Sequence, residues 1–274
     1  MKKIAMIATI VSTMAVSTAE ATLIMLFSAT GLNVAQITPT RDAFRAAIGG
    51  GAVAGANGSF GGVRREINWD GVPDALAAPN LLPADFFNVN SPRGVVYSTP
   101  GTGFEVSANA APGPIDFGNI NASYPGLFEA FSPQRLFTAL GSTITDVNFF
   151  LPGTTTPAVT SAFGVIFSDV DLAGTTMEFF DVLNNSMGVF AVPFVAGNQT
   201  FSFLGAVFDS PVVNRVRITS GNTALGPNES ALNDLVVMDD FIFAEPTNPV
   251  PEPGTLVLLG TGILAAVRRT RRKD

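Results

Sequence analysis

Short runs of β-branched and aromatic residues, separated by turn-forming residues, dominate the chain between residues 36 and 249. Such runs are typical of strands. No long helical segments lie between them, which favours antiparallel sheets joined by turns. We therefore predict an all-β fold, an antiparallel β-sandwich. The predicted strands are Arg65–Trp69, Gly94–Ser98, Gly103–Ala108, Asp146–Phe150, Ala162–Asp169, Thr175–Asp181, Met187–Val192, Thr200–Phe208, Val212–Thr219 and Asn233–Phe243.

Two of these runs also predict which faces are buried. Val216 and Ile218 alternate with Arg215 and Arg217, so this strand should bury one face and expose two arginines on the other. The run Leu235–Phe243 is apolar on both faces, which is typical of a central strand.

One short helix is expected before the first predicted strand. It should begin near Thr38–Thr40, place Phe44 on its apolar face and end at Gly49. The chain shows no internal repeat, and we expect a single body domain, residues 36–249.

The first residues have the pattern of a secretory signal peptide. Two lysines precede an apolar run, Ile4–Val16, as in the charged and hydrophobic regions of such signals. The sequence Ala19–Ala21 has the small-x-small form of a cleavage site. A second apolar run, Leu23–Phe27, follows it and leaves a cut as late as residue 35 open. We therefore assign residues 1–35 to the signal peptide.

The other end of the chain combines three features in order. Pro251, Glu252 and Pro253 form a rigid acidic motif, an apolar run Gly254–Val267 follows, and basic residues come last. The run is shorter than the ~20 residues that usually span a bilayer. No acidic residue interrupts it, so we expect a hydrophobic helix that meets the membrane. The basic residues that would stay on the cytoplasmic side include Arg268, Arg269, Arg271 and Arg272.

These ordered features resemble the PEP-CTERM segment of bacterial surface proteins. The resemblance covers only residues 250–274. It implies sorting by an exosortase, a membrane protease-transpeptidase that cuts near Pro251–Pro253. It also implies an exported protein of the cell surface, the outer envelope or the extracellular matrix.

The second half of the body carries four looser motifs: Phe163–Val165, Ser168–Asp171, Ser202–Gly205 and Val237–Phe241. With these motifs the body resembles an extracellular jelly-roll domain of the galactose-binding-like type. The resemblance implies a jelly-roll-like sandwich and a role in carbohydrate binding.

Composition excludes several mechanisms. The chain has no cysteine and no histidine, which excludes a Ser-His-Asp triad, a cysteine nucleophile and the usual zinc sites. A metal would need oxygen ligands, which favours calcium. Residues 36–249 carry eight arginines and nineteen acidic residues, a net charge of −11. Such a surface should repel nucleic acid and anionic lipid, and suit cations or neutral polymers.

Two adjacent aspartates, Asp239 and Asp240, lie in an otherwise apolar run. Neighbouring side chains on a strand face opposite ways, so at most one of them should point into a given core. A buried carboxylate needs compensation. Calcium, an arginine such as Arg215 or Arg217, or backbone N–H groups could supply it.

A second acidic pair, Asp169 and Asp171, should share one face of an extended strand just before a turn. This spacing suits either a calcium site, alone or together with the Asp239–Asp240 pair, or acids that cap the turn.

The single tryptophan is the best candidate for a sugar contact. Trp69 is flanked by Asn68 and Asp70, and sugar sites combine an aromatic platform with such polar groups. A tryptophan buried beside a turn is the alternative.

Together these patterns predict an exported structural or adhesive protein without catalysis of its own. Carbohydrate binding is the more specific form of this hypothesis, with an extracellular polysaccharide or the envelope as partner. The alternative is a secreted polysaccharide hydrolase or lyase that uses carboxylates. Calcium is the only cofactor that the sequence suggests.

Overall fold

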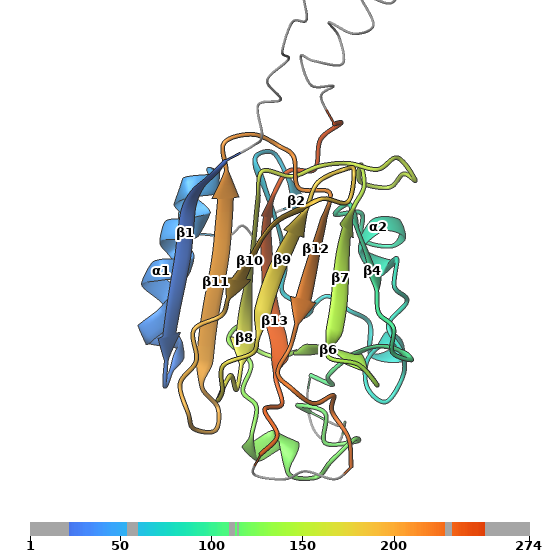
Figure 1. Ribbon diagram of the computed structural model, residues 1–274. Coiled ribbons are helices and arrows are strands. Elements are labelled where there is room, and N and C mark those ends of the chain that lie inside the picture. Colours follow the sequence, from blue (N-terminus) through green and yellow to red (C-terminus); the bar gives the residue numbers. More distant parts are fainter. Residues whose placement is uncertain (1–21, 54–59, 110–112, 114, 228–231, 250–274) are drawn as a thin grey trace, which may run out of the picture. The chain divides into compact units, whose positions relative to one another are not determined.

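Two antiparallel sheets form a sandwich, as predicted (Figure 1). This computed structural model describes residues 22–53, 60–109, 113, 115–227 and 232–249. The larger sheet has eight strands and contains the order β1-β11-β8-β13-β3-β2, with β6 pairing β13 and β5. The smaller sheet has five strands in the order β10-β9-β12-β7-β4.

All ten predicted strands are present, with ends shifted by a few residues. The larger sheet consists of β1 (Leu23–Gly31), β2 (Phe60–Gly61), β3 (Arg64–Ile67), β5 (Gly103–Val106), β6 (Phe137–Leu140), β8 (Ala162–Ser168), β11 (Phe201–Phe208) and β13 (Val237–Ala244). The smaller sheet consists of β4 (Val95–Ser98), β7 (Ile144–Phe149), β9 (Thr176–Phe180), β10 (Ser186–Ala191) and β12 (Arg215–Thr219).

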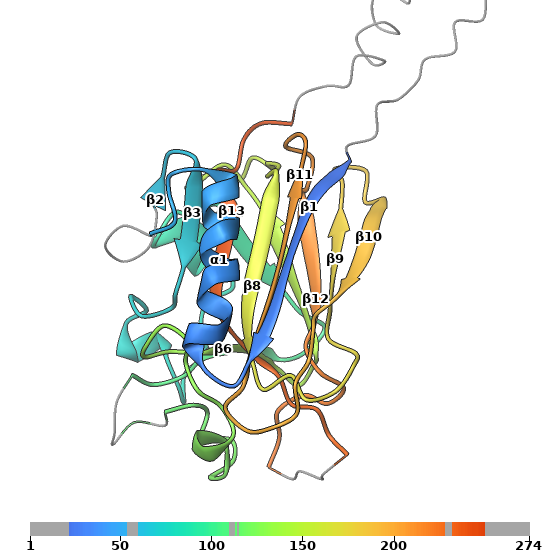
Figure 2. The same ribbon diagram turned by 90° about the vertical axis from the view of Figure 1, so that its left-hand side faces the viewer.

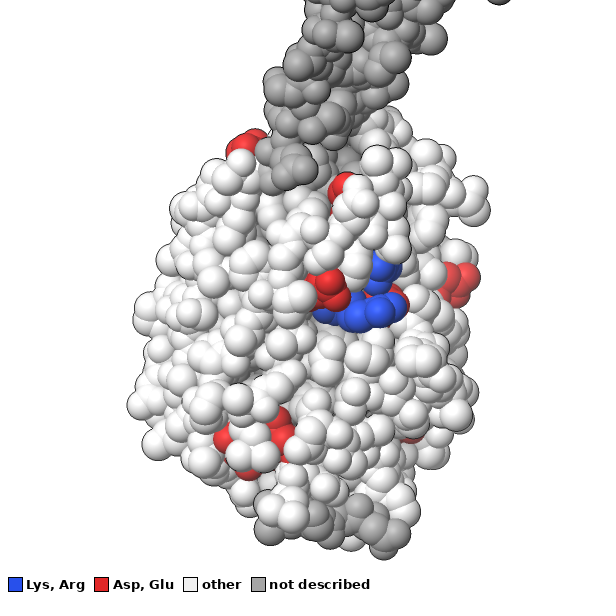
Figure 3. Space-filling view, viewed as in Figure 1, with Lys and Arg blue, Asp and Glu red and all other residues white. Residues whose placement is uncertain are grey.

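Strand β12 confirms the predicted alternation. Val216 and Ile218 are buried between the sheets. On the outer face, Arg215 and Arg217 both bind the carboxylate of Asp146, at 2.7 and 2.8 Å. The face of the molecule seen in Figure 3 is mostly uncharged and carries only small groups of charged residues.

Helix α1 (Val34–Ile48) packs on the outer face of the larger sheet (Figure 2). A dent in that face receives Phe44, because Gly164 of β8 pairs with Gly205 of β11. A Cβ atom at Gly164 or Gly205 would lie 2.7 or 2.8 Å from the Phe44 ring. The helix ends at Gly49, as predicted, but begins earlier than Thr38 because Ile37 also packs on the sheet.

The fold begins before residue 36. The prediction that the body domain starts at residue 36 is therefore wrong. Strand β1 pairs in register with β11 from Met25 to Gly31. An apolar strand and the apolar region of a signal peptide have the same composition, which explains why the sequence did not separate them. A cut at residue 31 or 35 would remove an entire edge strand.

Short helical turns complete the described chain. They are η1 (Asp74–Leu76), α2 (Phe86–Val89) and η2 (Tyr124–Gly126). None of the helices in the described ranges is long and apolar enough to span a membrane. The predicted sorting helix, with Pro251–Pro253 and the terminal arginines, lies outside the described residues.

Candidate functional site

Asp239 and Asp240 reach the same partner because the pairing of β13 with β8 is interrupted between them. Met238 and Phe241 are three positions apart in β13, but they pair with residues of β8 that are only two positions apart. The two aspartates between them therefore lie opposite a single residue of β8. This is a β-bulge, which redirects side chains. Both carboxylates contact the Ser132 hydroxyl, at 3.2 and 2.7 Å. The prediction that the pair faces opposite ways is therefore wrong.

Two of the predicted site acids hold the loop that contains Ser132. Asp239 Oδ2 accepts hydrogen bonds from the N–H groups of Phe131 and Ser132, at 2.5 and 3.1 Å. Asp70 Oδ1 accepts one from the N–H of Gln134 at 2.7 Å. The structure thus brings a predicted sugar contact, Asp70, and a predicted metal ligand, Asp239, to one loop. There both acids satisfy backbone donors.

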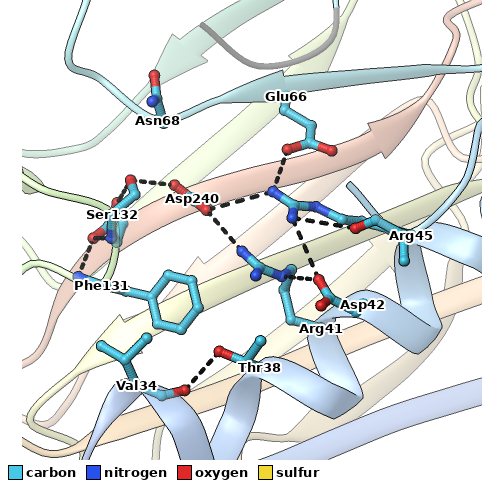
Figure 4. Close-up of polar contacts among 12 residues, drawn as sticks. Val34, Thr38, Arg41, Asp42, Arg45, Glu66, Asn68, Phe131, Ser132 and Asp240 are labelled. Atoms are coloured by element: carbon cyan, nitrogen blue, oxygen red, sulfur yellow. Dashed lines mark hydrogen bonds and ion pairs between the residues drawn. The ribbon is translucent and has the colours of Figure 1, made fainter. Parts of the chain in front are cut away.

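The cations beside the aspartate pair come from helix α1. Asp240 Oδ2 lies 3.7 Å from Arg41 Nη1 and 4.0 Å from Arg45 Nη2 (Figure 4). The prediction that an arginine of β12 compensates the pair is wrong, since those arginines bind Asp146 on the other sheet. Compensation by arginine and by backbone N–H groups, two of the three alternatives, is present.

The contacts of Ser132 fit an aspartate pair that carries a proton. The Ser132 hydroxyl has one hydrogen, yet it lies within hydrogen-bond distance of both carboxylates. A protonated carboxyl group would supply the hydrogen of a second hydrogen bond. Burial, and for Asp239 also the charge of its neighbour, raises the pKa of Asp239 well above its usual value, and burial raises that of Asp240. The pair therefore holds a proton at a pH where exposed aspartates are ionised.

Glu66 of β3 is the centre of a buried ion cluster beside the pair. Its two oxygens accept hydrogen bonds from Arg45 Nη2 and Arg64 Nε, both at 2.6 Å. Arg64 also donates to the carbonyls of Arg45 and Gly49 at the end of α1, where the helix dipole favours a cation. The cluster fastens the end of α1 to β3.

A separate hollow of about 240 Å³ opens beside Trp69. Trp69 follows β3 in a left-handed conformation, with φ of 66°, which is uncommon for a residue other than glycine. Helix α2 and the turn after it form the other wall. The hollow is lined by Asn68, Trp69, Gly71, Phe86, Phe87, Ser91 and Arg93.

Trp69 itself cannot act as an exposed platform. Its side chain is 1% exposed, its ring stacks on Phe137 with centroids 4.0 Å apart, and its Nε1 donates to the Asp239 carbonyl at 2.8 Å. The alternative of a tryptophan buried beside a turn is what the structure contains. Of the predicted sugar contacts, Asn68 and Trp69 line the hollow, whereas Asp70 does not.

The predicted calcium ligands do not form one cluster. Asp171 Oδ1 accepts a hydrogen bond from the N–H of Gly197 at 2.9 Å, and its own N–H donates to Asp234. Asp169 is buried. Within the described part of the chain, no three Asp or Glu side chains lie together as a metal site would require. Calcium binding stays a prediction.

Several residues of the site were not singled out from the sequence. Arg41, Arg45 and Glu66 surround the aspartate pair, and Arg93 lines the hollow. One signal was available: Arg41 and Arg45 are spaced to lie on one face of a helix, next to the buried Phe44.

Comparison with known protein families identifies the motif at the C-terminal end of the chain. Residues 249–273 match the PEP-CTERM protein-sorting motif. The chain carries a PEP-CTERM sorting signal. The motif indicates an exported, envelope-associated protein that an exosortase processes, and it confirms the resemblance found in the sequence.

The PEP-CTERM motif covers only the C-terminal end of the chain. No curated protein matches the chain. Among solved structures, the body is weakly similar to the enzymatically active domain of tailspike protein 4 of bacteriophage CBA120. The identity is 12%, the TM-score is 0.23, and the match covers 60% of this chain and 20% of that one. The galactose-binding-like resemblance stays a prediction.

Proposed function

We propose that the exported body is a structural or adhesive protein of the extracellular matrix or outer envelope that binds polysaccharide in the hollow beside Trp69. The PEP-CTERM motif supports the location. The hollow is the observation that supports polysaccharide binding, because its lining combines aromatic side chains with polar groups. At about 240 Å³ it lies below the ~300–1,000 Å³ of sites for drug-sized ligands, which suits a single sugar ring.

The alternative, a polysaccharide hydrolase or lyase, has less support. Glycosidases place two carboxyl groups on either side of the sugar bond. No Asp or Glu is among the residues that line the hollow. Asp239 and Asp240 are buried, and their oxygens contact the loop that contains Ser132 and the arginines of α1.

A glycine substitution gives a direct test of the proposed binding. Gly71 lines the hollow, and a Cβ atom there would meet nothing within 4 Å, so we expect Gly71→Leu to add a bulky apolar side chain at the hollow without disturbing the fold. We expect the exported protein to bind polysaccharides on a glycan array, and Gly71→Leu to abolish that binding. The matched control is Gly126→Leu, since a Cβ at Gly126 also meets nothing within 4 Å and lies outside the hollow.

Two results would contradict this proposal. One is unchanged binding by Gly71→Leu. The other is release of reducing ends from the bound polymer, which would identify the alternative enzyme. The array is run with calcium and with a chelator, so that it also tests the predicted calcium dependence.

Processing at both ends gives a further prediction. We expect the protein recovered from the cell exterior to begin at or before Leu23, because β1 belongs to the fold, and to lack Arg268–Lys273. Intact mass measurement tests both ends. Replacing Pro251 and Pro253 by alanine should leave the tail attached. Recovery of the natural protein with its terminal arginines would contradict the prediction.

A further inference from the structure

A small cavity lies between the two sheets, near the ends of β6 and β12 and the start of β7. Its volume is about 10 Å³, and it shares no lining residue with the hollow beside Trp69. Strand β6 of the larger sheet and strand β7 of the smaller sheet both contribute to it. None of its lining residues is charged, but many carry a hydroxyl group: Thr138, Ser142, Thr143, Thr145, Ser220 and Thr223.

Two of these hydroxyls have no hydrogen-bond partner among the described residues. They are Oγ1 of Thr145 and Oγ of Ser220, and the two residues are 1% and 7% exposed. A buried hydroxyl that leaves water and gains no partner destabilises the folded state. Two such groups in the lining of one cavity point to a ligand that bonds to both.

The pairing of β7 with β12 explains why both hydroxyls reach the cavity. Thr145 pairs with Ile218, and the N–H of Ser220 donates to the Thr143 carbonyl at 2.9 Å. Thr145 and Ser220 are therefore diagonal neighbours on the face that also buries Ile218. The Cβ atoms of diagonal neighbours lie about 7 Å apart. One small molecule that bonds to each hydroxyl at about 2.8 Å can bridge such a pair.

The larger sheet supplies a third polar group. Thr138 of β6 is buried, and its Oγ1 donates to the Ala139 carbonyl at 3.2 Å. A hydroxyl has one donor hydrogen and two acceptor lone pairs, so this oxygen can still accept a hydrogen bond. The cavity thus offers two hydroxyls that can donate or accept and a third that can accept.

The size and the chemistry of the cavity determine which ligand fits. One water molecule needs a cavity of about 10–15 Å³ and two to four polar partners. The cavity has about that volume and three hydroxyls of the required kind. A calcium or magnesium ion would need carboxylates, and no Asp or Glu lines the cavity.

We propose that the cavity binds one structural water molecule, which bonds to Thr145, Ser220 and Thr138 and so links the two sheets. The site is independent of polysaccharide binding. A buried water of this kind makes about three hydrogen bonds and is costly to remove. It fills a position where the rest of the sandwich packs apolar side chains.

A high-resolution crystal structure of the exported protein tests the site directly. We expect an ordered water within about 2.5–3.0 Å of the hydroxyl oxygens of Thr145 and Ser220. Two ordered side chains with no such water between them would overturn the proposal. A direct hydrogen bond between the two hydroxyls would overturn it as well.

Substitutions that remove a hydroxyl and keep the shape of the side chain give a test in solution. Thr145→Val should lower the melting temperature by about 2–4 °C, because the water loses a partner. Ser220→Ala should lower it in the same way. If the hydroxyls bind nothing, their removal should leave the melting temperature unchanged or raise it. The control is Thr155→Val, at an exposed position outside the cavity, which should change nothing.

The double variant shows whether the two hydroxyls share one ligand. Once Thr145→Val has weakened the hold on the water, the Ser220 hydroxyl contributes less. The loss in the double variant should therefore be smaller than the sum of the two single losses. Additive losses would contradict a shared water, and an unchanged or raised melting temperature in either single variant would contradict a ligand at that hydroxyl.

Discussion

Glu66→Gln should lower the free energy of unfolding by about 3–5 kcal/mol, since it removes one partner from a buried ion cluster. The Glu66 side chain is 3% exposed and holds both Arg45 and Arg64 at 2.6 Å. Without its charge, two buried guanidinium groups lose their common counter-ion. Urea unfolding followed by circular dichroism measures the loss.

The control is the same substitution in an ion pair whose carboxylate is more exposed. Glu245 also binds an arginine, Arg65, at 2.6 Å, but its side chain is 26% exposed. Glu245→Gln should cost less than Glu66→Gln, because Glu245 keeps more access to water. Equal losses for the two variants would show that burial does not determine the strength of the cluster.

The second large effect is a loss of thermal stability as the pH rises from about 5 to 8. Burial raises the pKa of Asp239 and Asp240, and it raises the pKa of Asp70 and Asp116 to about 6. The folded protein then binds more protons than the unfolded chain. These groups contribute most to the stability of the protein at low pH. Their contribution is lost as the pH rises through the pKa values that they have in the folded state.

One group acts in the opposite direction. Hydrogen bonds from Arg217 and Arg215 outweigh burial and lower the pKa of Asp146, so its contribution is lost as the pH falls toward and below 4. The melting temperature should therefore be highest in mildly acidic solution. From Asp70 and Asp116 together, discounted for solvent screening, we expect a loss of about 2–3 kcal/mol toward pH 8, or about 5–10 °C.

Variants of the aspartate pair test the origin of this pH dependence. Asn does not titrate, so Asp239→Asn should make the profile less steep and leave only the loss that Asp70 and Asp116 contribute between pH 5 and 8. Arg41, Arg45 and Glu66 face the pair and remain in place in this variant. Asp209→Asn, at an exposed position, should leave the profile unchanged. A natural protein with a flat profile would refute the shared proton.

The sheets could be predicted from the sequence, because turn residues and alternation act locally. The strand β12 shows this most clearly, since its buried and exposed residues follow the period of two. Strand β1 could not be assigned, because its apolar composition is also that of a signal peptide. The start of α1 was missed for a different reason: Ile37 and Phe44 pack on the sheet, and that packing outweighs the local signal at Pro39.

The candidate site depends on contacts that no local pattern contains. Asp239 binds Ser132, which is 107 residues away in the chain. A one-residue bulge in β13 decides that both aspartates reach it, and periodicity alone cannot predict such an insertion. Likewise, no local pattern shows that Trp69 stacks on Phe137 in the core.

The two ends of the described body lie on the same side of the sandwich. Thr22 accepts a hydrogen bond from the N–H of Asp209, just after β11, and Thr247 pairs with Val159, just before β8. Both ends lie at one pole of the sandwich, and η2 lies at the other (Figure 1). The η2 loops are therefore the part of the described body that lies opposite both of its ends.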